Sequence, residues 1–303
     1  MRILVTGGAV IGSNLVEELV KDHSVTVLDN FHTGDYQNLD SVKDQITIIN
    51  DSCNNLYRLD IPNIDVIYHL GIPSSSPMYK ENPFLVGDAI NGTINVFEYA
   101  KNKNIEKVIF SSSSSLYSGI KPPHREDMNV RVTDYYTEAR LTIERIAKLY
   151  NVLFGIKSAG LRFFSVYGPH EEYKKVYANI ITQFLWDMKK DKSPVIYGDG
   201  EQERDFIYVK DVVKACILML DKDFEYEIYN VGTDTSYSFN DIVVMLNDVL
   251  HKDIRPTYIE MLMSNYVQHT LADITKIKRL GYRPRYTLGE GINMLVSEYK
   301  NID

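Results

Sequence analysis

The stretch Thr6-Gly7-Gly8-Ala9-Val10-Ile11-Gly12 decides the fold of this chain. It follows a short apolar run, Ile3-Leu4-Val5, and precedes a segment, residues 15–20, whose apolar side chains recur at helical spacing. Glycines between a strand and a helix let backbone N–H groups approach a phosphate at the helix N-terminus. The turn therefore predicts a nucleotide-binding βα unit. Its candidate cofactor-binding residues are Gly7, Gly8, Val10, Ile11 and Gly12.

An acidic residue, Asp29, ends the next strand-like run, Val25–Leu28. A carboxylate at this place would accept hydrogen bonds from the ribose of an adenosine. The same carboxylate would repel a 2′-phosphate, so the sequence favours NAD over NADP. An ordinary βα turn without a ligand is the other interpretation of these residues.

Strand-like and helical segments alternate through the first 164 residues, which predicts βαβ units around a parallel sheet. Further apolar runs lie at 46–49, 66–70 and 108–110, and helices are expected at 84–101 and 135–150. Helices would cover both faces of such a sheet. The expected fold class is α/β, with a Rossmann-type doubly wound sheet in residues 1–164.

The order of elements is less regular from residue 165 to 303. Helices are expected at 178–190, 239–250 and 288–299, with a short strand at 257–259. The segment 206–231 resembles a strand, a helix and a strand. We expect a smaller, mainly substrate-binding lobe over 165–303, with the chain returning to the first domain near 205–232.

Composition excludes several classes of protein. The 303 residues are 44% apolar and 24% charged, which is ordinary for a globular protein. The formal charge of −8 argues against a nucleic-acid partner. Two cysteines, Cys53 and Cys216, suggest a reducing compartment. With no long apolar run and no apparent signal peptide, a cytoplasmic protein without membrane or metal partners is expected.

Candidate catalytic residues lie at Ser113, Tyr136 and Arg140. Tyr136 and Arg140 are four residues apart on an expected helix and therefore share a face. A cation beside a tyrosine favours the phenolate, which can serve as a general base near neutral pH. Ser113 follows a strand, where its hydroxyl could bind a reacting sugar hydroxyl or carbonyl. A surface contact is the commoner role of an isolated Tyr-x-x-x-Arg pair.

Over nearly its whole length, the chain resembles the extended short-chain dehydrogenases/reductases of the nucleotide-sugar epimerase type. The resemblance is carried by Thr6–Leu15, Asp29-Asn30, Tyr68–Leu70, Asn91–Thr93, Phe110–Tyr117, Tyr136–Glu144, Leu161–Pro169, Gly198–Gly200, Arg204–Val209, Tyr229–Gly232 and Ala272–Gly291.

The resemblance implies NAD-dependent epimerisation through a transient keto-sugar, with Tyr136 as acid/base and Ser113 assisting. Arg140 takes the place of the family's lysine, which also holds the nicotinamide ribose. The resemblance places Arg204 on the substrate diphosphate; an ion pair with Asp205 or Asp211 is the alternative. Further cofactor-binding residues implied are Asn30, Asp51, Leu70 and Asn91, and further substrate-binding residues are Ser74, Ser165, Lys174, Asn179 and Arg204.

The chain departs from the family pattern in its glycine turn, which is one residue short and lacks the middle glycine, and at Arg140. Ser165 replaces an asparagine that contacts the substrate diphosphate. Ser114 and Ser115 replace the acidic pair of sugar 4,6-dehydratases, which disfavours dehydration. The leading prediction is a UDP-hexose 4-epimerase acting on UDP-glucose and UDP-galactose. The alternatives are a catalytically weakened nucleotide-sugar or NAD-binding paralogue, a nucleotide-sugar reductase and a heptose-type epimerase.

The second half of the chain is also similar to ADP-glyceromanno-heptose 6-epimerase, and the lysine of that enzyme that matches Lys174 lies beside the reacting sugar. A lysine next to Lys175 is otherwise more often a solvated surface group. Homodimers are usual in the resembled family, and the expected helices 84–101 and 135–150 are the candidates for the interface.

Overall fold

A seven-stranded parallel sheet forms the centre of the molecule in the computed structural model, which describes residues 1–303 except 62, 133, 261–266 and 300–303. Its strand order is β11-β6-β5-β4-β1-β2-β3. This confirms the expected α/β fold with a doubly wound sheet. The strands are β1 (Arg2–Thr6), β2 (Ser24–Asp29), β3 (Ile46–Asn50), β4 (Val66–His69), β5 (Lys107–Ser113), β6 (Lys157–Phe163) and β11 (Tyr226–Val231).

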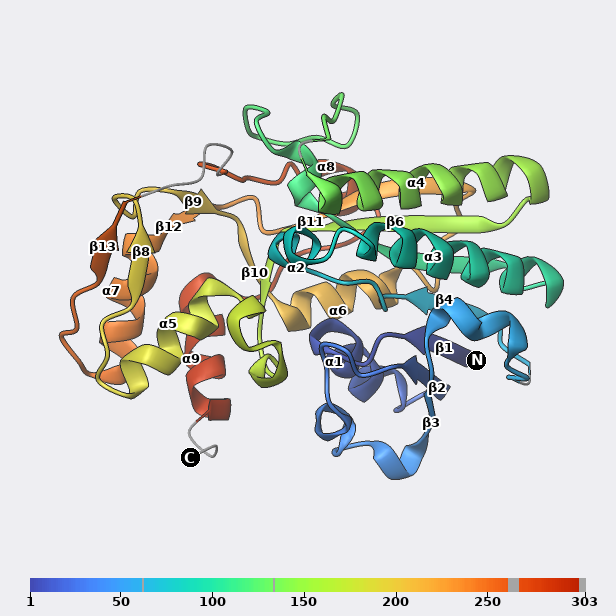
Figure 1. Ribbon diagram of the computed structural model, residues 1–303, viewed down its shortest axis with the longest axis horizontal. Coiled ribbons are helices and arrows are strands. Elements are labelled where there is room, and N and C mark those ends of the chain that lie inside the picture. The colour runs from blue at the N-terminus through green and yellow to red at the C-terminus, as the bar shows by residue number, and fades with distance from the viewer. Residues whose placement is uncertain (62, 133, 261–266, 300–303) are drawn as a thin grey trace.

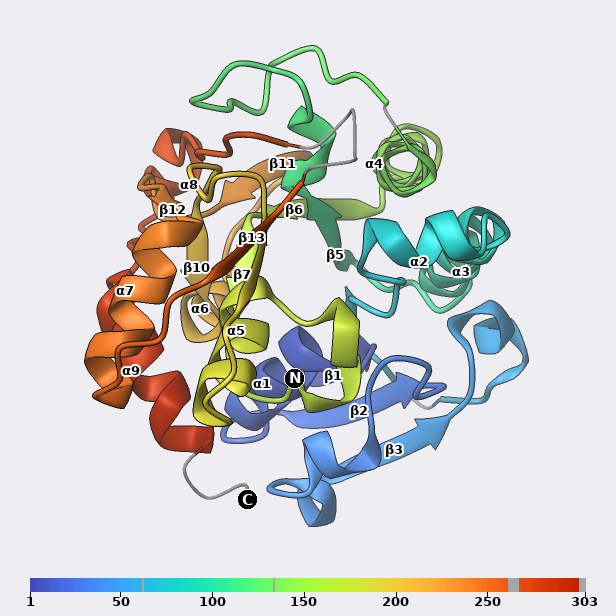
Figure 2. The same ribbon diagram turned by 60° about the vertical axis from the view of Figure 1, so that its left-hand side comes forward.

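Helices cover both faces of this sheet, as Figures 1 and 2 show. Ile3 and Val5 of β1 point to the face covered by α1 (Val10–Leu19) and α6 (Val209–Leu218). Leu4 between them belongs to the apolar cluster beneath α3 and α4. The alternation of side chains along a strand thus divides the core of the sheet into two layers. The helices of the second face are α2 (Ser76–Glu81), α3 (Leu85–Asn102) and α4 (Tyr135–Phe154).

The chain crosses back to the sheet after leaving it. β7 (Ser165–Tyr167) pairs in parallel with β10 (Phe206–Tyr208), and α6 follows directly. β11 then pairs with β6 over six positions, from Tyr226 opposite Ser158 to Val231 opposite Phe163. Residues of the second half therefore complete the edge of the central sheet.

Three helices beside the sheet form a smaller group around an apolar cluster of their own. The helices α5 (Ile180–Lys189), α7 (Phe239–Leu250) and α9 (Leu288–Glu298) pack there. Figure 1 shows them on the left, beside the sheet. The other elements are β8 (Val195–Tyr197), β9 (Glu203–Arg204), β12 (Tyr237–Ser238), β13 (Thr257–Ile259), α8 (Thr275–Lys278) and the 3₁₀ segments η1 (Tyr36–Leu39), η2 (Lys43–Gln45), η3 (Cys53–Arg58), η4 (Ser114–Tyr117) and η5 (Glu172–Tyr177).

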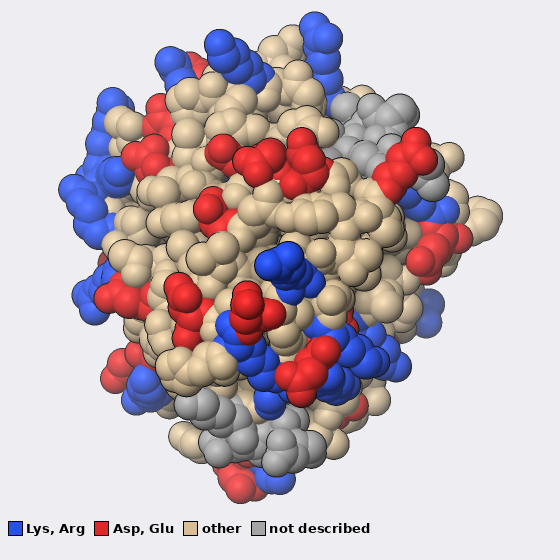
Figure 3. Space-filling view, turned by 90° about the vertical axis from the view of Figure 1, so that its left-hand side faces the viewer, with Lys and Arg blue, Asp and Glu red and all other residues tan. Residues whose placement is uncertain are grey.

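Acidic and basic side chains are interspersed on the surface of this smaller group, which faces the viewer in Figure 3. Such a distribution differs from the continuous basic stripe that follows a nucleic-acid backbone. Among the described helices, none is both long and apolar enough to span a bilayer.

Candidate active site

A cavity of about 820 Å³ lies along the carboxyl edge of the central sheet. Ligands of open α/β sheets bind at this edge, because loops from neighbouring strands converge there. Of the residues proposed from the sequence, those lining it are Gly7, Val10, Ile11, Gly12, Asp29, Asn30, Asp51, Leu70, Ser74, Ser113, Tyr136, Arg140, Ser165, Lys174, Asn179 and Arg204.

The glycine turn forms one wall of the cavity and has no room for larger residues. Gly7 has a φ of +87°, and a Cβ there would lie 2.6 Å from the Cα of Gly71. A Cβ on Gly12 would lie 1.7 Å from the carbonyl oxygen of Gly7. The shortened turn is therefore packed tightly between β1, the loop after β4 and the start of α1. α1 has no acidic residue in its first turn, so its positive end remains suited to a phosphate.

The Asp29 carboxylate lies at the same edge, beyond the turn. It accepts hydrogen bonds from the backbone N–H groups of Gly8 and, at 2.7 Å, of Phe31. Burial raises the pKa of Asp29, and these N–H donors oppose that shift. Gly8 thus contributes by holding Asp29 rather than by lining the cavity. A carboxylate here is compatible with a ribose diol and unfavourable for a 2′-phosphate, as the sequence predicts.

Two other predicted cofactor residues occupy different surroundings. Asp51 lines the cavity, and hydrogen bonds from the Asn55 amide and the Ser52 N–H lower its pKa. Asn91 is exposed on α3 and is not among the residues that line the cavity. The structure therefore does not bring Asn91 together with the other candidates.

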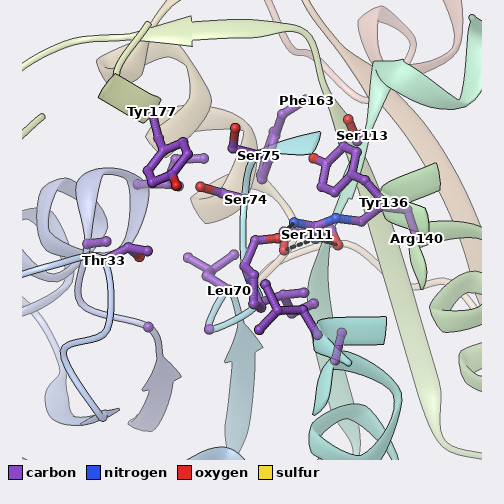
Figure 4. A pocket seen from close by; sticks show the side chains of 18 of the residues that line it. Thr33, Leu70, Ser74, Ser75, Ser111, Ser113, Tyr136, Arg140, Phe163 and Tyr177 are labelled. Atoms are coloured by element: carbon purple, nitrogen blue, oxygen red, sulfur yellow. Dashed lines mark hydrogen bonds between the residues drawn. The ribbon is translucent and has the colours of Figure 1, made fainter. Parts of the chain in front are cut away.

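Ser113 and Tyr136 come from the end of β5 and the first turn of α4. Both are at least nine-tenths buried, and Figure 4 shows them on the same side of the cavity. The Ser113 Oγ accepts a hydrogen bond of 3.1 Å from the N–H of Ser115. Its own proton therefore remains available to a ligand oxygen. The Tyr136 ring packs edge-on against Tyr79, with the centroids 5.4 Å apart, and this contact fixes its direction.

Arg140 joins strand β5 to the loop after β4, and both border the cavity. Its Nη1 donates to the carbonyl oxygen and to Oγ of Ser111, both at 3.1 Å, and its Nη2 donates to the Pro73 carbonyl at 3.0 Å. Its Cζ lies 5.0 Å from the ring centroid of Tyr136. Among the described residues its buried Nε has no hydrogen-bond partner. The guanidinium thus serves both as a structural clamp and as a fixed cation beside the tyrosine.

Of the candidate substrate residues, Ser165, Lys174 and Asn179 lie in or beside β7 and η5, whereas Ser74 follows β4 and Arg204 belongs to β9. The Asn179 amide donates to Ser165 Oγ at 3.1 Å and to the Val166 carbonyl at 2.9 Å. Lys174 lies 3.9 Å from Glu171, and its side chain is 17% exposed, which does not fit a solvated surface lysine. The Arg204 Nη1 donates to the Glu203 carbonyl at 2.8 Å, while its Cζ lies over the ring of Phe239.

Sequence reasoning did not single out three groups beside the cavity. Asp134, which caps α4, accepts hydrogen bonds from Ser76 and Thr137 and so fixes the start of the helix that carries Tyr136. Only the capping pattern, an acid three residues before Thr137, could have indicated it. Glu171 is fully buried, although it belongs to a charged run that resembles a solvated loop.

The third group is a buried ion pair behind the serine run. Arg162 on β6 and Glu144 on α4 form two hydrogen bonds, of 2.8 and 2.7 Å. Glu144 also accepts from Ser112 Oγ at 2.6 Å, and Arg162 donates to the Tyr117 hydroxyl at 2.7 Å. This network joins β5, β6 and α4 directly beneath the two catalytic candidates.

His69 lies at the end of β4, below the cavity. Its two ring nitrogens are 2.8 Å from Thr6 Oγ1 and 3.1 Å from Thr93 Oγ1. Burial lowers the pKa of His69 to about 3, so the ring is neutral at physiological pH. It therefore supports the floor of the site and does not act as an acid or base.

Comparison with known proteins gives consistent results. Residues 3–232 match the model of the NAD dependent epimerase/dehydratase family. A putative UDP-glucose 4-epimerase of Methanocaldococcus jannaschii is 33% identical, over 99% of this chain and 98% of its own. The solved UDP-N-acetylglucosamine 4-epimerase from Methanobrevibacter ruminantium, in complex with UDP-N-acetylmuramic acid, is 32% identical with a TM-score of 0.94, covering 99% and 98% of the two chains. The UDP-glucuronic acid 4-epimerase from Bacillus cereus, with UDP-glucuronic acid and NAD, is 28% identical with a TM-score of 0.90 over both full chains.

Proposed function

Because this chain belongs to the NAD-dependent epimerase/dehydratase family and is therefore an NAD-dependent enzyme of nucleotide-sugar chemistry, we propose that it is a UDP-hexose 4-epimerase. It would interconvert UDP-glucose and UDP-galactose through a 4-keto sugar. One observation carries the proposal: the glycine turn, Ser113 and Tyr136 line a single cavity. The full-length similarity to a putative UDP-glucose 4-epimerase supports the choice of sugar.

The residues of the cavity fit NAD. Gly7 and Gly12 of the glycine turn line the cavity with backbone alone, the first turn of α1 borders it, and Asp29 would accept hydrogen bonds from the adenosine ribose. The buried Nε of Arg140 is a donor that a ligand hydroxyl would satisfy. Held by these residues, NAD would supply reversible hydride transfer to and from the sugar.

Tyr136 would remove the proton from the C4 hydroxyl of the sugar and later return it. The guanidinium of Arg140, whose Cζ lies 5.0 Å from the centroid of this ring, would keep a fixed cation beside the tyrosine during the step. Ser113 would donate to the C4 oxygen, because its Oγ accepts from the N–H of Ser115 and so keeps its own proton for a ligand. Proton transfer by a positioned side chain contributes about 10²–10⁴-fold to a rate.

The cavity argues against dehydration. Ser114 and Ser115 line it where a dehydratase needs an acid to protonate the departing hydroxyl. The carboxylate of Asp134 also lines the cavity, but it accepts hydrogen bonds from Ser76 and from two groups of Thr137. It is therefore held as a helix cap.

The proposal includes a homodimer and a division of labour between two lobes. Residues 1–164 and the returning segment 205–232 would bind NAD, and the rest of 165–303 would bind the nucleotide sugar.

Large apolar side chains are exposed on the last turns of α4, and a second copy of the chain would cover them. These side chains are Leu149, Val152, Leu153 and Phe154. Sedimentation equilibrium measures the oligomeric state directly.

The test is conversion of UDP-galactose to UDP-glucose by the purified protein without added cofactor, beside UDP-N-acetylglucosamine and UDP-glucuronic acid. Catalytic conversion of a UDP-hexose supports the proposal. A requirement for stoichiometric NADH would identify a reductase instead. Tight binding of nucleotide sugars with no turnover, unaffected by Tyr136→Phe, would identify a binding protein.

A heptose-type 6-epimerase is a second candidate, favoured by the place of Lys174. Its side chain lies mostly buried at the cavity, where an additional proton donor or acceptor would be needed for that reaction. Turnover of ADP-glyceromanno-heptose that Lys174→Ala abolishes, with no activity on UDP-hexoses, would select this function.

A further inference from the structure

Glu171 is a buried carboxylate beside the cavity to which the mechanism above gives no role. It has no exposed surface and directly precedes η5. Its Oε1 accepts a hydrogen bond of 2.9 Å from the N–H of Asn179, and its Oε2 accepts one from Thr182 Oγ1. The backbone of Gly168 also stabilises the charged carboxylate. A buried carboxylate is nevertheless costly unless a cation faces it.

Lys174 is that cation. Its Nζ lies 3.9 Å from Glu171 Oε1, and it is the partner of Glu171 among the ion pairs of the described residues. Burial raises the pKa of Glu171, and Lys174 is the foremost of the groups that oppose this shift. Because Lys174 also lines the cavity, the carboxylate holds a flexible ammonium group at the substrate site.

A series of hydrogen bonds through Asn179 also connects Glu171 to Ser165. The N–H that Glu171 binds belongs to Asn179, whose side chain is fully used: Oδ1 accepts from Ile181, and Nδ2 donates to Val166 and to Ser165 Oγ. Because Ser165 Oγ accepts the amide proton, its own hydroxyl proton is left to donate into the cavity. Asn179 thus acts on a ligand through Ser165 rather than directly.

We infer that Glu171 is a positioning residue that holds Lys174 and, through Asn179, Ser165 as two donors to the oxygen atoms of the nucleotide sugar. This inference rests on the proposed function and deepens it by naming what orients its substrate site. Two donors from one anchor suit an anionic, oxygen-rich ligand, and their loss should weaken binding of the sugar nucleotide but not of NAD.

The substitution Glu171→Gln removes the charge and little else. The carboxamide oxygen can still accept from Asn179, and its NH₂ can donate to Thr182 Oγ1, which is able to accept. Lys174 then loses its partner and regains the rotamer freedom of a long side chain. Calorimetric titration of the NAD-loaded protein with UDP-glucose should give a Kd about tenfold higher than wild type.

Lys174→Met should weaken binding by a similar factor, and the double variant should be no weaker than either single variant, because both act through one contact. NAD content, measured in the supernatant after denaturation, should stay at the wild-type value. Where UDP-glucose turns over, KM should rise about tenfold with kcat within about threefold of wild type, a split that general unfolding would not produce. Glu172→Gln, one residue along, makes the same change of charge and should bind like wild type.

Unchanged Kd in Glu171→Gln would overturn the inference, as would additive losses in the double variant or an equal loss of NAD. Wild-type protein that binds UDP-glucose without converting it would refute the epimerase while the comparison of Kd values still decides the role of Glu171. If wild type converts UDP-glucose but Glu171→Gln binds it with the wild-type Kd, the proposed function stands and the role of Glu171 is refuted. If wild type binds none of UDP-glucose, UDP-N-acetylglucosamine and UDP-glucuronic acid, the proposed function and the role of Glu171 are both refuted.

Discussion

Replacing Arg140 by lysine separates the two roles of this residue. The guanidinium makes three hydrogen bonds to Ser111 and Pro73, and hydrogen bonds to charged groups contribute roughly 1.5–3 kcal/mol each. A single ammonium group on a shorter stem cannot reach both Ser111 in β5 and Pro73 in the loop after β4 as the planar fork does. We therefore expect Arg140→Lys to lose about 2–4 kcal/mol of unfolding free energy.

Arg140→Lys should affect turnover less than stability. Lysine keeps a positive charge beside Tyr136, so kcat should remain within about tenfold of wild type. Arg140→Met removes both the clamp and the charge, and should lose similar stability together with about 10²-fold or more of kcat.

The assay is urea unfolding at one fixed NAD concentration, because bound cofactor adds its own stabilisation. Arg145→Lys, on an exposed position of the same helix, is the matched control and should change stability by less than about 0.5 kcal/mol. If Arg140→Lys is as stable as this control, the hydrogen bonds of Arg140 to Ser111 and Pro73 do not stabilise the fold. If its kcat falls as far as that of Arg140→Met, the charge alone is not what Tyr136 needs.

Four further outcomes follow from the structure. Tyr136→Phe should lower kcat by about 10²–10⁴-fold in the epimerase assay while leaving the calorimetric Kd for the nucleotide sugar near wild type. Gly12→Ala, whose Cβ would lie 1.7 Å from a backbone oxygen of the glycine turn, should yield protein that carries no NAD after purification, as judged by the absorbance of the denatured supernatant. Glu144→Gln leaves the buried Arg162 without its counter-charge and should cost about 3–5 kcal/mol in urea unfolding; a loss below about 1 kcal/mol would contradict a buried pair. Burial lowers the pKa of His69 from 6.5 to about 3, so its contribution to stability is complete above pH 6.5 and is lost at about 1.4 kcal/mol per pH unit as pH falls towards 3; His69→Gln should flatten that part of the stability–pH curve.

The elements that the sequence predicted best are those with strong local signals. The helix 239–250 and the strand 257–259 have the expected bounds, and α5 lies within the predicted 178–190. The α/β fold, the family resemblance and NAD as cofactor are likewise confirmed. Periodicity and the glycine turn carry this information because they act over a few neighbouring residues.

The surroundings of single side chains were harder to predict. Glu171 and Lys174 belong to a run of charged residues whose local pattern indicates solvent, yet tertiary packing buries the first completely. Arg140 was expected to serve the tyrosine and the cofactor, but its contacts with Ser111 and Pro73 depend on a strand and a loop that only the fold brings together. The assignments of cofactor and substrate contacts stay predictions for the mutations above to test.

The late pairing of β11 with β6 has a consequence for folding during synthesis on the ribosome. Strand β6 ends at Phe163, but its neighbour is complete only at Val231. At about 5–20 residues per second, a ribosome leaves that strand as an open edge for roughly 3–14 s of synthesis. An unpaired apolar strand is a template for pairing with other chains. A nascent chain stalled before β11 would thus be a natural client for a chaperone, and translation speed between the two strands would influence how much enzyme reaches the folded state.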